Sequence, residues 1–370
     1  MSRSFHNKIL CVNLSKKTVA VEEPGEAYLR RYMGGWNLIA DVLLKRVPAG
    51  ADPLGPDNVL VYAPGVLTGL AISGASRSAV GAKSPVTGGF GAAEAGGGFP
   101  AQLKRAGFDA LIVEGAADSP VYLWIADGAC EIRDASALWG RGTRETEATI
   151  RAEVGQERAE LAMIGPGGEN MVQYACVMHG LKDAAGRTGL GAVMGSKRLK
   201  AVAAFGSESV DGADADTVRA MARRAAQEVR EGTRAAWAAR AGTGGEGLEH
   251  GVLSGNMPIR NFRDGEFPEI SGLEYIMQKI GVRMEGCWAC AVRCKKVVQA
   301  EAPYGVDPIY GGPEYETIGS LGSTCGVSDI VAVSRANQLC NEYSLDTIGT
   351  GVTIAFAMEC YENGLLTRED

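Results

Sequence analysis

The chain changes its sequence pattern near residue 206, and this change constrains the fold more than any other feature. Between residues 58 and 206, short apolar or alternating runs recur, and turn-forming residues separate nearly all of them. After Gly206, long stretches rich in Ala, Arg and Glu carry apolar residues at helical spacing. The sequence therefore predicts an α+β protein, with a large, mostly antiparallel β domain over residues 1–208 and a mainly α-helical domain over residues 209–370.

The individual elements follow from the local pattern. Residues 9–13 and 18–22 flank a polar Ser-Lys-Lys turn and predict a β-hairpin. Further strands are expected at seven runs: 59–62, 78–82, 110–114, 121–126, 161–164, 172–177 and 201–205. Helices are expected over 26–47, with a break at the Gly34-Gly35 pair, and over 143–153, 214–241, 327–343 and 347–366. The glycine-rich segment 242–255 is expected to be a loop.

Composition and charge exclude several classes of protein. Glycine makes up 51 of the 370 residues without a Gly-X-Y period, and 46% of the residues are hydrophobic, so the chain is neither collagen-like nor disordered. The net charge is -7 and there is no long Lys/Arg block, which argues against nucleic acid or an anionic membrane as a partner. The sequence shows no signal peptide and no apolar run of about 18 residues. We therefore expect a globular, cytoplasmic protein.

The sharpest chemical signal is a C-x2-C-x3-C cluster formed by Cys287, Cys290 and Cys294. Three thiolates this close along the chain can reach one metal centre, which favours an iron–sulfur cluster completed by a fourth cysteine. Structural zinc and unligated core thiols are the alternatives. A radical-SAM enzyme is disfavoured because its cysteines follow the opposite order. Three later cysteines are candidates for the fourth ligand, each otherwise a small buried hydrophobe: Cys325, Cys340 and Cys360.

A second signal is the concentration of ten glycines between Gly65 and Gly98, interspersed with Ser, Thr, Arg77 and Lys83. Glycine lets backbone N–H groups approach an anion, and the basic side chains add charge, so a phosphate-bearing cofactor would suit this segment. Tight β-turns are the alternative, and no P-loop motif is present. Residues 185–197 repeat the same chemistry before a predicted helix.

The third signal is a pair of carboxylates, Glu314 and Glu316, on either side of Tyr315. In a helix the two side chains would diverge, whereas in an extended segment they would share a face. The alternative is a pair of solvated surface acids.

Taken in this order, the segments resemble the tungsten-containing aldehyde ferredoxin oxidoreductase family, and the resemblance covers essentially the whole chain. The matching motifs are Tyr32-Met33-Gly34-Gly35, Ser84-Pro85-Val86-Thr87-Gly88 followed by Gly96-Gly97, residues 104–110, residues 189–197, Arg260-Asn261-Phe262, the three cysteines, residues 312–316 and residues 341–346. One such match would carry little weight, but the ordered set is specific.

The resemblance implies tungsten, or in rare members molybdenum, held by two pterin cofactors, with a [4Fe-4S] cluster close by. It further implies oxidation of small aldehydes to carboxylates, with electrons passing to ferredoxin or a ferredoxin-like subunit. Cys287, Cys290 and Cys294 would supply three cluster ligands. Arg77 would lie between cluster and pterin. Glu316, with Glu314 as second candidate, would move a proton as water adds to the aldehyde carbon.

The resemblance also assigns residues to the pterins and to the Mg²⁺ that bridges their phosphates. These residues are Gly88, Glu94, Ala95, Gly96, Gly97, Gly186, Arg187, Gly189, Gly191, Asn341, Leu345 and Asp346. Three positions depart from the family pattern. Asn341 and Ser344 replace the first Asp and the Gly of D-x-x-G-L-D, and Glu94 stands where some members have Asn.

Family members are considerably longer than this chain, and their third domain supplies the second pterin motif, the fourth cysteine and a catalytic histidine. The histidines present here, His6, His179 and His250, do not match that position. We therefore expect a truncated or split chain. The alternatives are an enzyme that borrows ligands from a partner, a cofactor-binding protein without turnover, and a related tungsten subunit that acts on another substrate such as an aromatic acyl-CoA. A homo-oligomer is compatible with the sequence.

Overall fold

The computed structural model describes residues 4–232, 234–243, 246–270 and 275–370. The described residues form two compact units. The first comprises Met1–Ala226, Cys287–Ala291 and Glu342–Leu345, and the second comprises Gln227–Gly286, Val292–Asn341 and Asp346–Asp370. The first unit holds both large sheets and the second is mainly helical, so the predicted α+β class is confirmed. The boundary at residue 208 stays a prediction.

The first unit contains two six-stranded sheets. One has the order β2-β1-β6-β3-β4-β5, formed by Thr18–Glu22, Ile9–Asn13, Ala110–Glu114, Leu60–Pro64, Ser78–Lys83 and Phe90–Ala95. The other has the order β11-β10-β9-β12-β7-β8, formed by Asp183–Ala185, Val177–His179, Glu160–Met163, Leu199–Phe205, Val121–Ala126 and Ala129–Asp134. Each sheet has one parallel pair, β1 with β6 and β12 with β7, and the other pairs are antiparallel.

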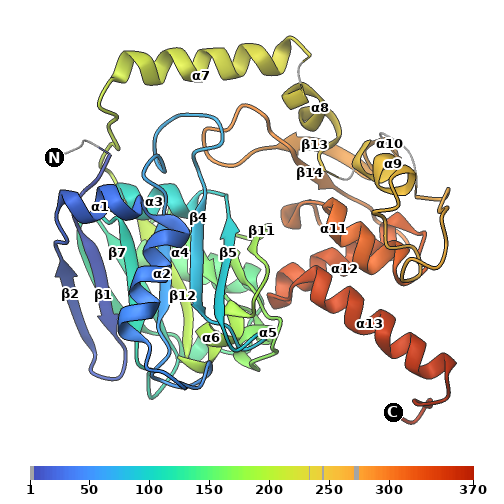
Figure 1. Ribbon diagram of the computed structural model, residues 1–370, viewed down its shortest axis with the longest axis horizontal. Helices are drawn as coiled ribbons and strands as arrows, with labels where there is room; N and C mark the ends of the chain where they lie inside the picture. Colours follow the sequence, from blue (N-terminus) through green and yellow to red (C-terminus); the bar gives the residue numbers. More distant parts are fainter. Residues whose placement is uncertain (1–3, 233, 244–245, 271–274) are drawn as a thin grey trace. The chain divides into compact units, whose positions relative to one another are not determined.

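Alternate residues of the first sheet enter two different cores. In β1, Leu10 and Val12 join a core that also contains residues of the second sheet and of helices α3 (Phe99–Arg105) and α6 (Leu190–Ser196). Ile9 faces the opposite side and packs in the core of helix α2 (Gly35–Arg46), which covers that face (Figure 1). Because both faces are covered, the central strands are apolar throughout rather than alternating.

Four further helical segments complete the first unit: α1 (Glu26–Tyr32), η1 (Ser136–Leu138), α4 (Thr143–Val154) and α5 (Pro166–Glu169). The predicted break at Gly34-Gly35 separates α1 from α2. Gly34 has φ +78°, and a Cβ atom there would overlap the carbonyl oxygen of Pro64, so only glycine fits.

The second unit is built from helices around a small antiparallel hairpin. Its elements are α8 (Arg234–Ala241), α9 (Glu246–Leu253), α10 (Tyr275–Ile280), β13 (Gly281–Glu285), β14 (Lys295–Val298), η2 (Pro308–Tyr310), α11 (Tyr315–Thr317), the π-helix η3 (Ile318–Ser323) and α13 (Thr347–Glu362). Helices α7 (Ala215–Arg230) and α12 (Ile330–Tyr343) begin in one unit and end in the other. No helix of the described residues has both the length and the apolar character that a membrane span requires.

Two sequence expectations were wrong. Residues 172–176 form turns and β10 begins only at Val177, because the backbone here bonds to other partners: Cys176 N–H donates to Ser344 O (2.8 Å) and Ala175 O accepts from Gly191 N–H (3.0 Å). The segment 242–255 is not a simple loop, since helix α9 occupies Glu246–Leu253. Strand β5 was not expected, because glycines at its start resemble a turn.

Candidate cofactor and metal site

The glycine-rich segments of the first unit lie against one another. The Ser84 hydroxyl, at the start of the turn between β4 and β5, donates to Thr188 O (2.8 Å). A Cβ atom on Gly189 would lie 2.8 Å from the Pro85 ring, and one on Gly191 would overlap the Cys176 carbonyl oxygen. The glycines at 189 and 191 are therefore required by close packing within the chain itself.

Gly88 differs from these packed glycines because a Cβ atom there would meet no atom within 4 Å. Its φ of +71° and its N–H bond to Ser84 O (2.8 Å) mark it as a turn glycine. The turn is exposed to solvent. An exposed backbone turn beside the 186–191 segment is compatible with the phosphate-binding role predicted for both segments.

Arg77 and Glu94 form an exposed ion pair at the other end of the β4–β5 hairpin, a strand length away from this turn. The pairing of Ser78 with Ala95 in strands β4 and β5 brings the two side chains together, with Arg77 Nη1 3.2 Å from Glu94 Oε2. The side chains are 59% and 42% exposed, so the pair contributes little to stability. The guanidinium therefore remains accessible to an anionic group.

Two of the three clustered cysteines, Cys287 and Cys290, contact this part of the first unit. Trp288 N–H donates to Gly97 O (3.3 Å), and Ala291 N–H donates to the Ser73 hydroxyl oxygen (3.1 Å), which also lies 3.4 Å from Cys290 Sγ. A Cβ atom on Gly96 would overlap Cys287 Sγ. Gly96 thus forms a cradle that only a residue without a side chain can provide.

The thiol set and the Gly96 cradle suit an iron–sulfur cluster, because such clusters are held by cysteine thiolates. Cys294, the third predicted ligand, belongs to the second unit. Within the part of the chain that the structure describes, no three His, Cys, Asp or Glu side chains gather closely enough to hold a metal ion.

The remaining cysteines behave as packed thiols. The described ranges hold all nine cysteines, and none of them forms a disulfide. Burial raises the pKa of Cys130 to about 12 and that of Cys340 to about 11, and it also raises the pKa of Cys325. Cys325 Sγ donates to Ser320 O (3.4 Å), whereas Cys360 is half-buried on α13. Which residue completes the cluster stays open.

His179 hydrogen-bonds to the backbone of Gly96, and the burial of its ring makes the free energy of unfolding depend on pH. Nδ1 donates to Gly96 O (3.2 Å), and burial lowers the pKa of the ring to about 4 against a weaker opposing effect of that bond and Asp183. Above pH 6.5 the ring is neutral in both folded and unfolded chains. Between pH 6.5 and about 4 only the unfolded ring binds a proton, so the free energy of unfolding falls as the pH falls.

We expect this contribution to amount to about 3 kcal/mol. Burial also raises the pKa of Glu160 to about 7. The folded carboxyl therefore binds a proton at a higher pH than the unfolded one, and this raises the free energy of unfolding as the pH falls below about 7. The test is therefore a comparison of urea unfolding between the wild type and His179→Phe at pH 7 and pH 4.5. The wild type should lose more stability than the variant on acidification, and equal losses would contradict the prediction.

Gly96→Ala is expected to displace Cys287, because the new methyl group and the thiol cannot occupy the same volume. The measurement is the iron content of the anaerobically purified protein, which should fall by half or more. Gly265→Ala is the control, since Gly265, like Gly96, lies outside the positive-φ region, but a Cβ there meets nothing within 4 Å. Unchanged iron in Gly96→Ala would show that the cradle is not needed.

The two predicted glutamates point in different directions in the second unit. Glu314 is extended (φ -85°, ψ 170°) and precedes α11, whereas Glu316 lies in the first turn of that helix. Glu314 Oε1 lies 3.7 Å from Lys296 Nζ, and its Oε2 accepts from the Thr243 hydroxyl. Burial alone would raise the pKa of Glu314, but Lys296, Lys295 and Thr243 hold it below its usual range. Neither alternative holds for the whole segment, since Glu314 is extended and Glu316 is helical, and the two carboxylates have different surroundings.

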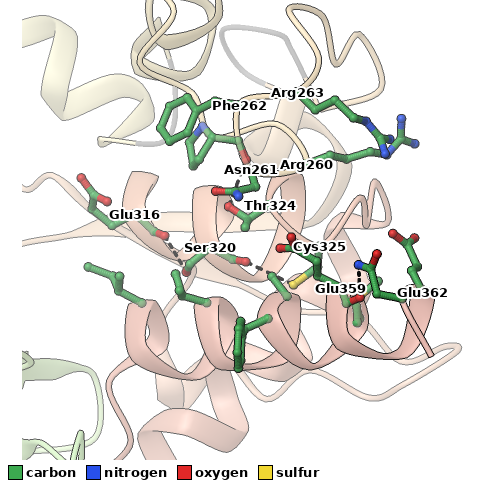
Figure 2. A pocket seen from close by; sticks show the side chains of 17 residues that line it. Arg260, Asn261, Phe262, Arg263, Glu316, Ser320, Thr324, Cys325, Glu359 and Glu362 are labelled. Carbon is green, nitrogen blue, oxygen red and sulfur yellow. Dashed lines mark hydrogen bonds between the residues drawn. The ribbon is translucent and has the colours of Figure 1, made fainter. Parts of the chain in front are cut away.

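Glu316 is exposed and lines a cavity of about 600 Å³. Figure 2 shows Glu316 at one end and Glu359 and Glu362 at the other, with side chains of the 258–263 segment along one side. Helix α13 contributes apolar side chains, among them Val352 and Phe356. A cavity with an apolar side along α13 and carboxylates at both ends suits a small organic molecule.

The wall opposite α13 is a strained turn. Arg260, Asn261 and Phe262 all have positive φ, at 41°, 58° and 63°, and Arg263 N–H donates to Arg260 O (3.3 Å). Such conformations cost about 1–3 kcal/mol per non-glycine residue and persist where the surrounding structure enforces them. Here Arg260 N–H donates to Ser323 O (2.9 Å) and its guanidinium pairs with Asp264 (2.7 Å).

The other predicted pterin residues have structural contacts of their own. Asn341 Nδ2 donates to Tyr310 O (3.1 Å), and the Asp346 carboxylate accepts from Ile348 N–H (3.1 Å) and Gly349 N–H (3.2 Å) at the start of α13. Leu345 forms a β-bridge with Ala175 in the first unit. Their role in cofactor binding stays a prediction.

Sequence reasoning missed Lys296 and Thr243. The pattern Lys-Lys-Val-Val predicts a short strand with solvated lysines, and nothing in the pattern indicates that Lys296 is buried. The only available signal was its position two residues after Cys294.

Two protein-family profiles match the chain. The aldehyde ferredoxin oxidoreductase N-terminal domain matches residues 9–206, and domains 2 and 3 of the same enzyme match residues 220–370. The chain belongs to the aldehyde ferredoxin oxidoreductase family. The resemblance inferred from the motifs is thereby confirmed.

Individual members of the family share the whole length of this chain. A tungsten-containing aldehyde ferredoxin oxidoreductase of Thermococcus kodakarensis is 42% identical over 374 aligned residues, covering 98% of this chain and 60% of that protein. The WOR-like subunit of an aliphatic sulfonate oxidoreductase of Pyrococcus furiosus is 34% identical over 99% of this chain and 61% of that protein.

A solved structure, the active site complex BamBC of benzoyl coenzyme A reductase with 1,5-dienoyl-CoA, superimposes with a TM-score of 0.84 at 28% identity. The superposition covers all of this chain and 58% of the chain in that structure. The chain thus spans about three fifths of the length of the proteins that it matches.

Proposed function

We propose that this chain is the larger part of a tungsten-pterin oxidoreductase that oxidises small aldehydes to carboxylates. Its electrons would leave through a [4Fe-4S] cluster to ferredoxin or a ferredoxin-like subunit, in the cytoplasm. The observation that carries the proposal is the contact of Gly96 with Cys287, because it joins the segment assigned to the pterin and the segment assigned to the cluster.

Each group has candidate residues on this chain. Cys287, Cys290 and Cys294 would hold the cluster. Arg77 would lie between cluster and pterin, where its exposed guanidinium balances negative charge. The turn at Gly88, the end of β5 and the 186–191 segment would contact the pterin phosphates and Mg²⁺. When bound, the tungsten centre supplies two-electron redox chemistry.

The overall reaction converts one aldehyde and one water into a carboxylate, with release of three protons and two electrons. This chain's part in it is to bind the aldehyde and to accept a proton. The apolar side of the cavity would hold the hydrocarbon part of the substrate. Glu316 is exposed to the cavity and is the better proton acceptor, because Glu314 is already paired on both oxygens.

A second candidate function is reduction of an aromatic acyl-CoA. It is favoured by one observation, the similarity at TM-score 0.84 to the BamBC complex of benzoyl coenzyme A reductase. The 42% identity to a tungsten-containing aldehyde ferredoxin oxidoreductase is higher, so we favour aldehyde oxidation.

The experiment that separates these functions is a dye-linked assay on protein purified anaerobically with its partner polypeptides. A panel of short aliphatic and aromatic aldehydes is tested for reduction of a viologen, and benzoyl-CoA is tested for oxidation of the reduced dye. Aldehyde-dependent dye reduction is the expected result. Activity with benzoyl-CoA alone would favour the second function.

A further inference from the structure

Lys296 is a buried lysine beside the glutamate segment. It lies in β14, which begins directly after Cys294, and its side chain is inaccessible to solvent. An ammonium group is rarely buried unless a charge compensates it, and here the nearest opposite charge is Glu314 Oε1 at 3.7 Å. The chain therefore places an ion pair, with the lysine buried and the Glu314 side chain 32% exposed, between the last predicted cluster ligand and the predicted catalytic segment.

Two glycines make room for the Lys296 side chain. A Cβ atom on Gly242 would lie 2.8 Å from Lys296 Nζ and 2.6 Å from Cys294 O, and one on Gly312 would lie 3.2 Å from Lys296 Cβ. A side chain at Gly242 would overlap the Cys294 backbone as well as Lys296, and one at Gly312 would crowd Val298 and Lys296. The Lys296 side chain therefore lies between two close-packed glycines, with its ammonium near Glu314.

Thr243 completes the arrangement. Its hydroxyl donates to Glu314 Oε2 and accepts from Tyr315 N–H (3.2 Å). Glu314 O in turn accepts from Ile318 N–H (3.0 Å). Hydrogen bonds thus fix the Glu314 side chain, the Glu314 carbonyl and the Tyr315 N–H. These three groups define the start of the helix that carries Glu316.

We propose that Lys296 is a positioning residue, which acts through Glu314 and Thr243 to hold Glu316 in its orientation toward the cavity. This inference rests on the proposed function, since it takes Glu316 as the proton acceptor. Under this inference Glu314 fixes the start of the helix and does not accept the proton. A misplacement of about 1 Å at a catalytic group can cost about 100-fold in rate, so a fixed helix start matters.

The test compares Lys296→Met with Lys200→Met. Lys200 is the control, because its buried ammonium also pairs with a glutamate, Glu169 in the first unit, although that carboxylate is more buried (3% exposed) than Glu314 (32%). Both variants should lose thermal stability, since each removes the cation that pairs with a carboxylate, and Lys200→Met should lose more because Glu169 is buried. Only Lys296→Met should lower kcat, by about 100-fold, with KM changed by less than about twofold.

Hydrogen exchange gives a readout that does not depend on turnover. The Tyr315 amide, which donates to Thr243, should exchange at least about tenfold faster in Lys296→Met and at the wild-type rate in Lys200→Met. Unchanged exchange and kcat in Lys296→Met would overturn the inference. So would a loss of kcat in Glu314→Gln as large as in Glu316→Gln, because Glu314 would then be the acceptor. If the wild type oxidises no aldehyde, the proposed function fails, while exchange at Tyr315 still tests the anchor.

Discussion

Cys287→Ser is expected to remove most of the iron from the protein. Iron–sulfur clusters are held by soft thiolate ligands, and a serine hydroxyl is a harder and weaker ligand. Cys287 is also the cysteine that Gly96 cradles, so its position is fixed by the fold rather than by flexible chain. The measurements are iron content and the visible absorbance near 400 nm of protein purified anaerobically. We expect both to fall to less than about a fifth of the wild-type values.

Cys130→Ser is the control for this substitution. Cys130 lies in β8, and burial raises the pKa of its thiol to about 12, so it is no thiolate at neutral pH. This variant should keep its iron. Iron retained in Cys287→Ser, or lost equally from both variants, would contradict the assignment of Cys287 to a cluster.

Glu316→Gln is expected to lower kcat for aldehyde oxidation by about 10²- to 10⁴-fold, the usual range for loss of a general base. The amide keeps the size of the side chain but accepts no proton from water. KM should change little, because the apolar cavity walls that would bind the aldehyde are intact. The measurement is steady-state kinetics on the loaded enzyme with one aliphatic and one aromatic aldehyde.

Glu266→Gln provides the comparison, since it removes one exposed carboxylate of the second unit that does not line the cavity. Its kinetics should match the wild type. If Glu316→Gln retains more than about half of kcat, the proton acceptor lies elsewhere.

Much of the fold could be predicted where side-chain pattern and burial agree. Strands β1 and β6 were located within their observed bounds because each is a compact apolar run with polar or turn residues at its ends. Strand β5 was missed because its first residues include Gly91, where a Cβ atom would lie 2.9 Å from Ser84 Cβ and 3.1 Å from Thr188 Oγ1. A glycine required by a close approach cannot be told from a turn glycine by sequence alone.

The candidate site was predictable in its residue types but not in its contacts. Cysteine spacing predicted a metal cluster, and glycine content predicted anion-binding loops, yet neither indicated that Gly96 lies against Cys287. Two alternatives for the glutamates were open from the sequence. The structure matches neither alternative as a whole, because Glu314 is extended and paired with Lys296, whereas Glu316 lies in the first turn of a helix. The partners of a buried lysine are a tertiary property that no local pattern encodes.

The central claim is that this chain takes part in binding tungsten and iron, and metal analysis tests it most directly. Protein produced anaerobically, in a host supplied with tungstate and with its partner polypeptides present, is analysed for tungsten, iron and zinc. The account predicts tungsten together with about four irons per chain, the content of one [4Fe-4S] cluster. Zinc without tungsten or iron would contradict it and would identify Cys287, Cys290 and Cys294 as a structural zinc site.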